Sequence, residues 1–122
     1  NLNNQSLLFK EEVVFEQFVH IHYLDSKYIM GYSVDGYIGL YENMGSKIQK
    51  VWSLRLNHID SLIDYENNVY IIDGENSLLS VVNFSNGIKM QDYKLIWEPN
   101  NVFIDNKYLG CFNERKLYYL NL

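Results

Sequence analysis

The stretch Asp25-Ser26-Lys27-Tyr28-Ile29-Met30 decides the fold, because it returns twice further along the chain. It comes back as Glu66-Asn67-Asn68-Val69-Tyr70-Ile71 and again as Asp105-Asn106-Lys107-Tyr108-Leu109-Gly110. Each copy is a polar turn followed by an apolar strand, and the copies lie about 40 residues apart, a spacing typical of repeat folds. Repetition of this kind predicts architecture much better than it predicts chemistry.

Composition indicates that the repeated elements are strands. The chain has 122 residues, enough for one domain. It contains no Ala and no Thr, only 1 Pro and as many as 11 Tyr. Ala is the strongest helix former, whereas aromatic and branched residues favour strands, so we expect an all-β fold.

Apolar alternation and turn residues divide the chain into four-stranded antiparallel units of about 40 residues. We expect units at about 20–56, 57–97 and 100–122, the last one incomplete, preceded by strands within 6–19. Residues 1–122 are therefore interpreted as a single repeat domain. Hairpin turns that end in Gly after an Asn predict positive φ angles at Gly45 and Gly87.

Charge and cysteine content narrow the class of partner and the compartment. The net charge is -5 and the basic residues are scattered, which argues against nucleic acid and anionic membranes as partners. No apolar run approaches the ~18 to 20 residues of a membrane helix, so membrane insertion is not expected. The single Cys111 cannot form an internal disulfide, which favours an intracellular location, cytoplasmic or nuclear.

The first whole unit resembles a blade of a WD-repeat β-propeller. The matching run is 33–45, with a small residue, an Asp-Gly turn, an alternating strand and a Gly-closed hairpin. Tyr41-Glu42 stands where that family usually has Trp-Asp, and His58 is similar to the His that opens a blade. The resemblance implies a segment of a larger propeller that serves as a non-enzymatic scaffold for other proteins in a complex.

A β-trefoil is the alternative fold, since it is built from three four-stranded units and has about this length. It would imply a module that binds carbohydrate or a receptor at shallow sites. Such a site needs an aromatic platform beside Asp or Asn, and only the first unit offers one plainly, in Asp35 with Tyr37.

Three aromatic residues are the predicted partner contacts, namely Tyr32, Tyr37 and Trp97. Each is aromatic and lies close to a turn. Trp97 lies beside the break at Pro99, and aromatic side chains on exposed loops commonly anchor interfaces. For Trp97, core or inter-unit packing is the favoured interpretation and a partner contact is the alternative.

No motif for catalysis, a metal or a cofactor stands out. His20 and His22 share one face of a strand, but a metal site needs further ligands. The Asp residues lie mainly at turns, where a short polar side chain is favoured for structural reasons. We therefore predict no catalytic residue, no metal and no cofactor.

Overall fold

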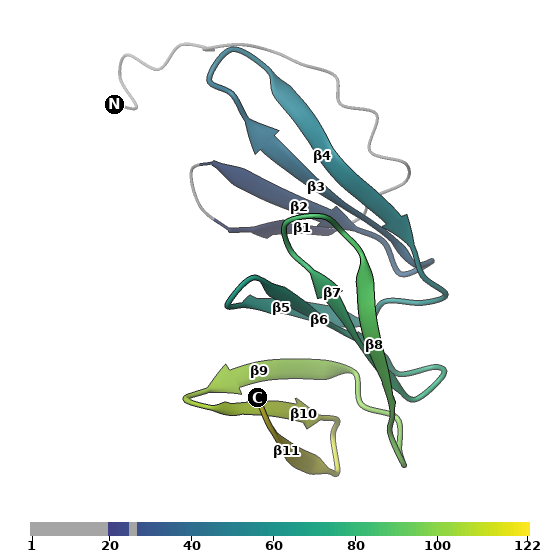
Figure 1. Ribbon diagram of the computed structural model, residues 1–122. Coiled ribbons are helices and arrows are strands. Elements are labelled where there is room, and N and C mark those ends of the chain that lie inside the picture. The colour runs from purple at the N-terminus through teal and green to yellow at the C-terminus, as the bar shows by residue number, and fades with distance from the viewer. Residues whose placement is uncertain (1–19, 25–26) are drawn as a thin grey trace, which may run out of the picture.

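The computed structural model describes residues 20–24 and 27–122, which form 11 strands in three separate sheets (Figure 1). The strands are β1 (His20–Tyr23), β2 (Tyr28–Tyr32), β3 (Tyr37–Asn43), β4 (Ile48–Arg55), β5 (Ser61–Tyr65), β6 (Asn68–Asp73), β7 (Leu78–Asn83), β8 (Lys89–Lys94), β9 (Asn101–Asp105), β10 (Tyr108–Phe112) and β11 (Leu117–Asn121).

Each sheet is an antiparallel meander in chain order. Sheet 1 holds β1 to β4, sheet 2 holds β5 to β8, and sheet 3 holds β9 to β11. The sheets follow one another in a stack, with sheet 2 in the middle (Figure 1). The predicted all-β fold of four-stranded repeat units is confirmed, and the third unit has three described strands, as expected. The β-trefoil alternative does not hold, because within the described residues no strand pairs with a strand of another unit.

The first strand of the second unit begins several residues after the expected start of that unit. The unit was expected from about residue 57, whereas β5 begins at Ser61. Ile59 is instead fully buried in the loop before β5, where its N–H donates to Val34 O. The strands expected within 6–19 lie outside the described residues.

Glycines set the geometry of the turns. Gly45 has φ of 86° and Gly87 has φ of 72°, as the Asn-to-Gly spacing predicted. Gly36 has φ of 103°, in the Asp-Gly turn between β2 and β3. The turn at Glu66 and Asn67 also has positive φ, 46° and 65°, at two non-glycine residues of a tight hairpin.

The core lies between the sheets rather than within any one of them. One buried cluster joins sheets 1 and 2, with Met30 and Leu40 packed against Ile71 and Val82. A second cluster joins sheets 2 and 3 and includes Leu109. Because both faces of sheet 2 are apolar, it can pack against a neighbour on each side.

Candidate functional site: a rim of loops

Five connections lie on one side of the stack, and we call them together the rim. They are the loops β2–β3, β4–β5, β6–β7, β8–β9 and β10–β11, on the right in Figure 1. Strands of an antiparallel meander alternate in direction, so every second connection lies at the same end. Loops held in this way by a rigid sheet frame are common places for binding residues.

The first two loops of the rim are joined by backbone hydrogen bonds. Leu56 N–H donates to Gly36 O at 2.7 Å, and Ile59 N–H donates to Val34 O at 3.2 Å. A Cβ atom on Gly36 would lie 2.2 Å from Leu56 O, which is far too close. Gly36 therefore provides both the positive φ and the space that this contact requires.

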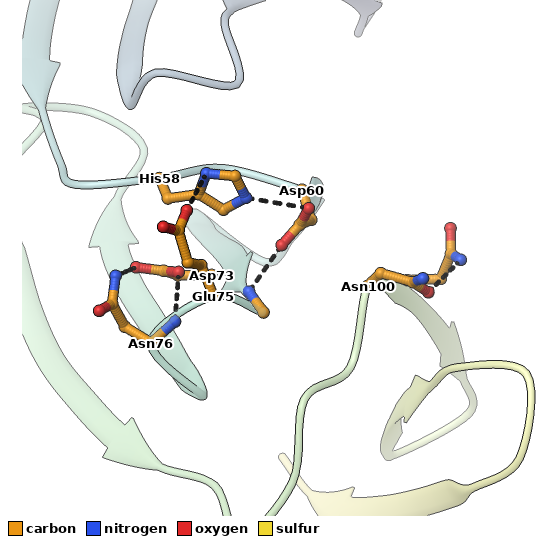
Figure 2. A network of polar contacts seen from close by, with 8 residues as sticks. His58, Asp60, Asp73, Glu75, Asn76 and Asn100 are labelled. Atoms are coloured by element: carbon orange, nitrogen blue, oxygen red, sulfur yellow. Dashed lines mark hydrogen bonds and ion pairs between the residues drawn. The ribbon is translucent and has the colours of Figure 1, made fainter.

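His58 joins the loop after sheet 1 to the turn inside sheet 2 (Figure 2). Its Nε2 lies 3.1 Å from Asp60 Oδ1, and its Nδ1 lies 3.1 Å from Glu75 Oε2. Asp60 Oδ2 accepts a hydrogen bond of 2.6 Å from Gly74 N–H. These contacts position the rim, so the ring and both carboxylates already have structural partners.

The same turn also meets the loop between sheets 2 and 3. Asp73 is 5% exposed and accepts two bonds from Asn76, one from its backbone N–H at 2.9 Å and one from its side chain at 2.8 Å. A Cβ atom on Gly74 would lie 2.2 Å from Pro99 O. Three successive connections are thus fixed relative to one another.

A polar hollow of about 220 Å³ opens beside the rim, between the end of sheet 1 and the outer strands of sheet 2. Arg55 and His58 line one side, and Lys89 and Asp92 line the other. Asp92 accepts hydrogen bonds from Lys89 Nζ at 2.8 Å and Ser80 Oγ at 2.6 Å. The bond from Lys89, and after it the bond from Ser80, hold the pKa of Asp92 below its usual value.

Tyr32 ends β2 on the face toward sheet 2. It packs against the first buried cluster, and its ring stacks on His20 with centroids 5.1 Å apart. Burial raises the pKa of its hydroxyl above the usual value, so the group stays protonated. Tyr32 therefore has a packing role whether or not it contacts a partner.

Tyr37 begins β3 on the opposite face of sheet 1, because Tyr32 pairs with the next residue, Ile38. The Arg55 guanidinium carbon lies 4.4 Å from the Tyr37 ring centroid, and its Nη1 donates to the Tyr37 hydroxyl. Tyr37 is half-buried and Arg55 is exposed. The two predicted tyrosines thus share one end of sheet 1 but not one patch.

Trp97 is buried, in agreement with the packing interpretation and not with a partner contact on an exposed loop. It is 7% exposed and belongs to the buried cluster between sheets 2 and 3. Its ring lies 5.3 Å from that of Tyr118, centroid to centroid. The Pro-containing break turns the chain inward, and the indole fills the space between two sheets.

The two histidines of β1 have separate surroundings. His22 Nε2 lies 2.9 Å from Asp64 Oδ1 on β5, a contact between sheets 1 and 2, while His20 stacks on Tyr32. Within 20–24 and 27–122, no three or more His, Cys, Asp or Glu side chains are grouped to hold a metal. In the same residues no helix is long and apolar enough to cross a membrane.

Arg55 is the rim residue that the sequence did not reveal. It follows an alternating strand and looks like an ordinary solvent-facing charge, and its partner lies 18 residues away. A signal existed in the strand register, since Tyr37 opens β3 and Arg55 closes β4, which places them opposite each other.

Comparisons with known proteins agree with this fold. No protein-family model matches the sequence, and no curated protein matches it either. The computationally designed Ika8 protein superposes with a TM-score of 0.63 at 16% identity, over 82% of this chain and 32% of its own. Hsv2 of Kluyveromyces lactis superposes with a TM-score of 0.57 at 10% identity, over 80% of this chain and 30% of its own.

The chain spans less than a third of the length of either structure. Both are β-propellers, and the matched parts are successive four-stranded sheets. At these identities the likeness concerns the fold alone. The three stacked meanders are therefore a segment of a β-propeller.

Proposed function

We propose that this chain is a non-enzymatic scaffold that binds other proteins through its rim, as part of a larger protein or complex. The observation that supports this most directly is the exposed Arg55 stacked on Tyr37, at strand ends next to loops fixed by Gly36 and His58. Arg and Tyr are enriched at the centres of protein interfaces. A side chain that is already ordered also loses less conformational entropy on binding.

The neighbouring hollow supports binding rather than catalysis. Its carboxylate Asp92 is bonded to Lys89 and Ser80, and its histidine His58 is bonded to Asp60 and Glu75. A general acid or base needs a titrating group available to the substrate. These groups instead contact one another and hold the surface in shape.

The test compares two variants of the chain in quantitative affinity capture from isotope-labelled extracts, followed by cross-linking to locate the contact. The first variant combines Tyr37→Ala with Arg55→Ala. The matched control is Met44→Ala, because Met44 is 50% exposed and lies in the loop between β3 and β4, at the opposite end of the strands from the rim. We expect the rim variant to lose bound proteins that the control retains, with cross-links at the rim in the wild-type chain.

Thermal midpoints of both variants establish that they are folded. An unchanged set of bound proteins in the rim variant, at unchanged abundance, would contradict the proposed role of Tyr37 and Arg55. Cross-links found only at the opposite end of the strands would also contradict the proposed role of the rim.

A further inference from the structure

Asn86 is the one asparagine of the chain that is followed by glycine. The pair lies in the turn of the β7–β8 hairpin, where Asn86 is exposed and Gly87 is buried with φ of 72°. An asparagine before glycine is chemically labile, because glycine has no side chain to keep its backbone nitrogen away from the side-chain amide carbon. How fast this pair reacts therefore depends on the conformation of the turn.

The reaction of such a pair is a ring closure followed by hydrolysis. The Gly87 nitrogen attacks Cγ of Asn86 and forms an N–Cγ bond, the Cγ–Nδ2 bond breaks, and the Gly87 proton is transferred to Nδ2, which leaves as ammonia. Water then opens the succinimide. Opening at Cγ gives aspartate, whereas opening at the backbone carbonyl carbon gives isoaspartate, in which the main chain runs through Cγ. No oxidant or reductant takes part.

Hydrogen bonds of the turn engage both reacting groups. The Gly87 N–H donates to Asn83 O at 2.9 Å, so the attacking nitrogen already has a partner. Asn86 Oδ1 accepts a bond of 3.0 Å from Ile88 N–H, and this Asx turn fixes the side-chain amide. Ring closure removes the Gly87 proton and needs the nitrogen and Cγ to meet in the correct orientation, so it competes with both bonds.

Asn83 holds the same turn from the end of β7. Its Oδ1 accepts bonds from Ser85 N–H at 2.9 Å and from Asn86 N–H at 3.2 Å. Its backbone N–H donates to Ile88 O at 2.9 Å, which closes the hairpin. The peptide between Asn86 and Gly87 therefore cannot rotate far without breaking several bonds of the turn.

Sheet 1 holds the hairpin from outside. Trp52, on β4, is 8% exposed, and its Nε1 donates to Phe84 O at 2.7 Å. A Cβ atom on Gly87 would lie 2.5 Å from the indole ring, so the ring packs directly on the glycine. On this side the turn has no room to rearrange while the indole is in place.

We propose that Asn86 is a site of spontaneous conversion to isoaspartate and that the packing of the β7–β8 hairpin on Trp52 controls the rate. While the hairpin is closed the reaction is slow, because the reacting groups are bonded and the glycine is covered. Local opening costs less free energy than unfolding of the whole chain, and it releases the turn so that the ring can close. The extent of reaction therefore records how much the interface between sheets 1 and 2 has opened.

Isoaspartate prevents the hairpin from closing again on sheet 1. Its main chain is longer by one carbon atom before Gly87, so the spacing that lets the Gly87 N–H reach Asn83 O is lost. The same change displaces Gly87 from the indole of Trp52. We expect Trp52 to become exposed in the isoaspartate form, whereas aspartate keeps the normal main chain and leaves Trp52 covered.

Peptide mass spectrometry of the full chain, incubated at mildly alkaline pH, measures the rate. Replacement of NH2 by OH changes the mass, and fragmentation of the peptide locates the change at Asn86 and distinguishes isoaspartate from aspartate. A synthetic peptide of residues 82–91 gives the rate without the fold. We expect the folded chain to react roughly tenfold or more slowly than the peptide, because only the opened hairpin reacts.

Two conservative variants test the role of Trp52. Trp52→Phe removes the donor to Phe84 O and should accelerate the reaction of the folded chain roughly tenfold. Trp97→Phe is the matched control, because it alters the cluster between sheets 2 and 3 and keeps Trp52 in place. Its rate at Asn86 should stay close to that of the wild-type chain.

The effect on the interface is measured in the Trp97→Phe chain, because its remaining tryptophan is Trp52. The isoaspartate form should show red-shifted emission and stronger quenching by acrylamide than the fresh chain. In the same background, fresh Asn86→Asp and incubated Asn86→Gln should both keep the buried emission, since neither lengthens the main chain. Hydrogen exchange of the hairpin in fresh and incubated wild-type chain gives the same comparison if Trp97→Phe does not fold.

Reaction of the folded chain at the rate of the peptide would overturn control by the hairpin, as would equal acceleration by Trp52→Phe and Trp97→Phe. If the peptide reacts fully while Asn86 stays intact in both the wild-type and Trp52→Phe chains, the site itself is wrong. An isoaspartate form that keeps Trp52 buried would contradict the effect on the interface. The β7–β8 turn is not part of the rim, so these outcomes are independent of the proposed function.

Discussion

Trp52 Nε1 donates a hydrogen bond of 2.7 Å to the carbonyl oxygen of Phe84, which joins the last strand of sheet 1 to the outer hairpin of sheet 2. The indole is 8% exposed and belongs to the buried cluster between these sheets. Separate sheets have no ladder hydrogen bonds between them, so contacts of this type fix how one sheet sits on the next. Substitution of Trp52 therefore reports how much the packing between sheets 1 and 2 contributes to stability.

Trp52→Phe should lower the free energy of unfolding by about 1–3 kcal/mol, because it removes the donor and leaves Phe84 O without its partner. Chemical denaturation of both chains measures the difference. Tyr93→Phe is the control, since Tyr93 is an exposed aromatic residue on the corresponding strand of sheet 2. Equal effects of the two substitutions would show that the Trp52 bond adds no stability.

Gly87→Ala should destabilise the chain more than Gly45→Ala, although both glycines have positive φ, 72° and 86°. Either alanine carries backbone strain of roughly 1–2 kcal/mol. A Cβ on Gly87 would also lie 2.5 Å from the Trp52 ring, whereas nothing lies within 4 Å of one on Gly45. Denaturation midpoints give the comparison, and midpoints shifted equally would argue against close packing of Trp52 on this turn.

Trp97→Ala should destabilise the chain by about 3–5 kcal/mol, the range for deleting a buried aromatic side chain. The indole is buried with Leu109 and contacts Tyr118. Tyr37→Ala is the comparison, and its effect should be much smaller because Tyr37 is half-buried beside an exposed arginine. A Trp97 variant as stable as the wild-type chain would contradict this packing role and leave Trp97 as a candidate partner contact.

Sequence reasoning succeeded where local chemistry determines structure. The turns at Gly36, Gly45 and Gly87 follow from residues that tolerate positive φ, and strand alternation follows from side chains pointing to opposite faces. Both are set by neighbours within a few residues. The number of strands in each repeat therefore follows from the sequence alone.

The position of each side chain relative to other sheets could not be predicted in this way. Trp97 and Tyr119 are both aromatic and close to turns, yet one is 7% exposed and the other 52%. The difference depends on whether a further sheet lies against that face. Both faces of sheets 2 and 3 are rich in apolar residues, so alternation alone does not distinguish a covered face from an open one.

Cys111 should resist thiol reagents while the chain is folded. Its side chain is 1% exposed, and burial raises its pKa to about 11. The thiolate is the reactive form, so at pH 8 reaction with an aromatic disulfide reagent should be at least about 100-fold slower in buffer than in urea. Because the pKa of Cys111 is higher in the folded state than in the unfolded state, its contribution to stability is fully present below the unfolded value, pH ~8.5. That contribution is lost as pH rises through the folded value. Similar rates in buffer and urea would contradict the burial.

Asp92 should make the stability of the chain depend on pH in the acid range. Hydrogen bonds from Lys89 and Ser80 hold its pKa below the usual value in the folded state. Its contribution is therefore fully present above the unfolded value, about 4, and is lost as pH falls through the lower folded value. Asp92→Asn should be less stable than the wild-type chain at pH 7, and the difference should shrink progressively as the pH is lowered below 4.

Urea denaturation at pH 7, 4 and 2.5 measures this difference. Lys89→Met is the companion variant, because it removes the first cause of the lowered pKa and keeps the carboxylate. It should reproduce much of the Asp92→Asn effect at pH 7 and very little of it at pH 2.5, where the carboxyl is protonated. A gap between Asp92→Asn and the wild-type chain that stays constant over this range would mean that the amide changes packing, because only a change in charge can make the difference titrate.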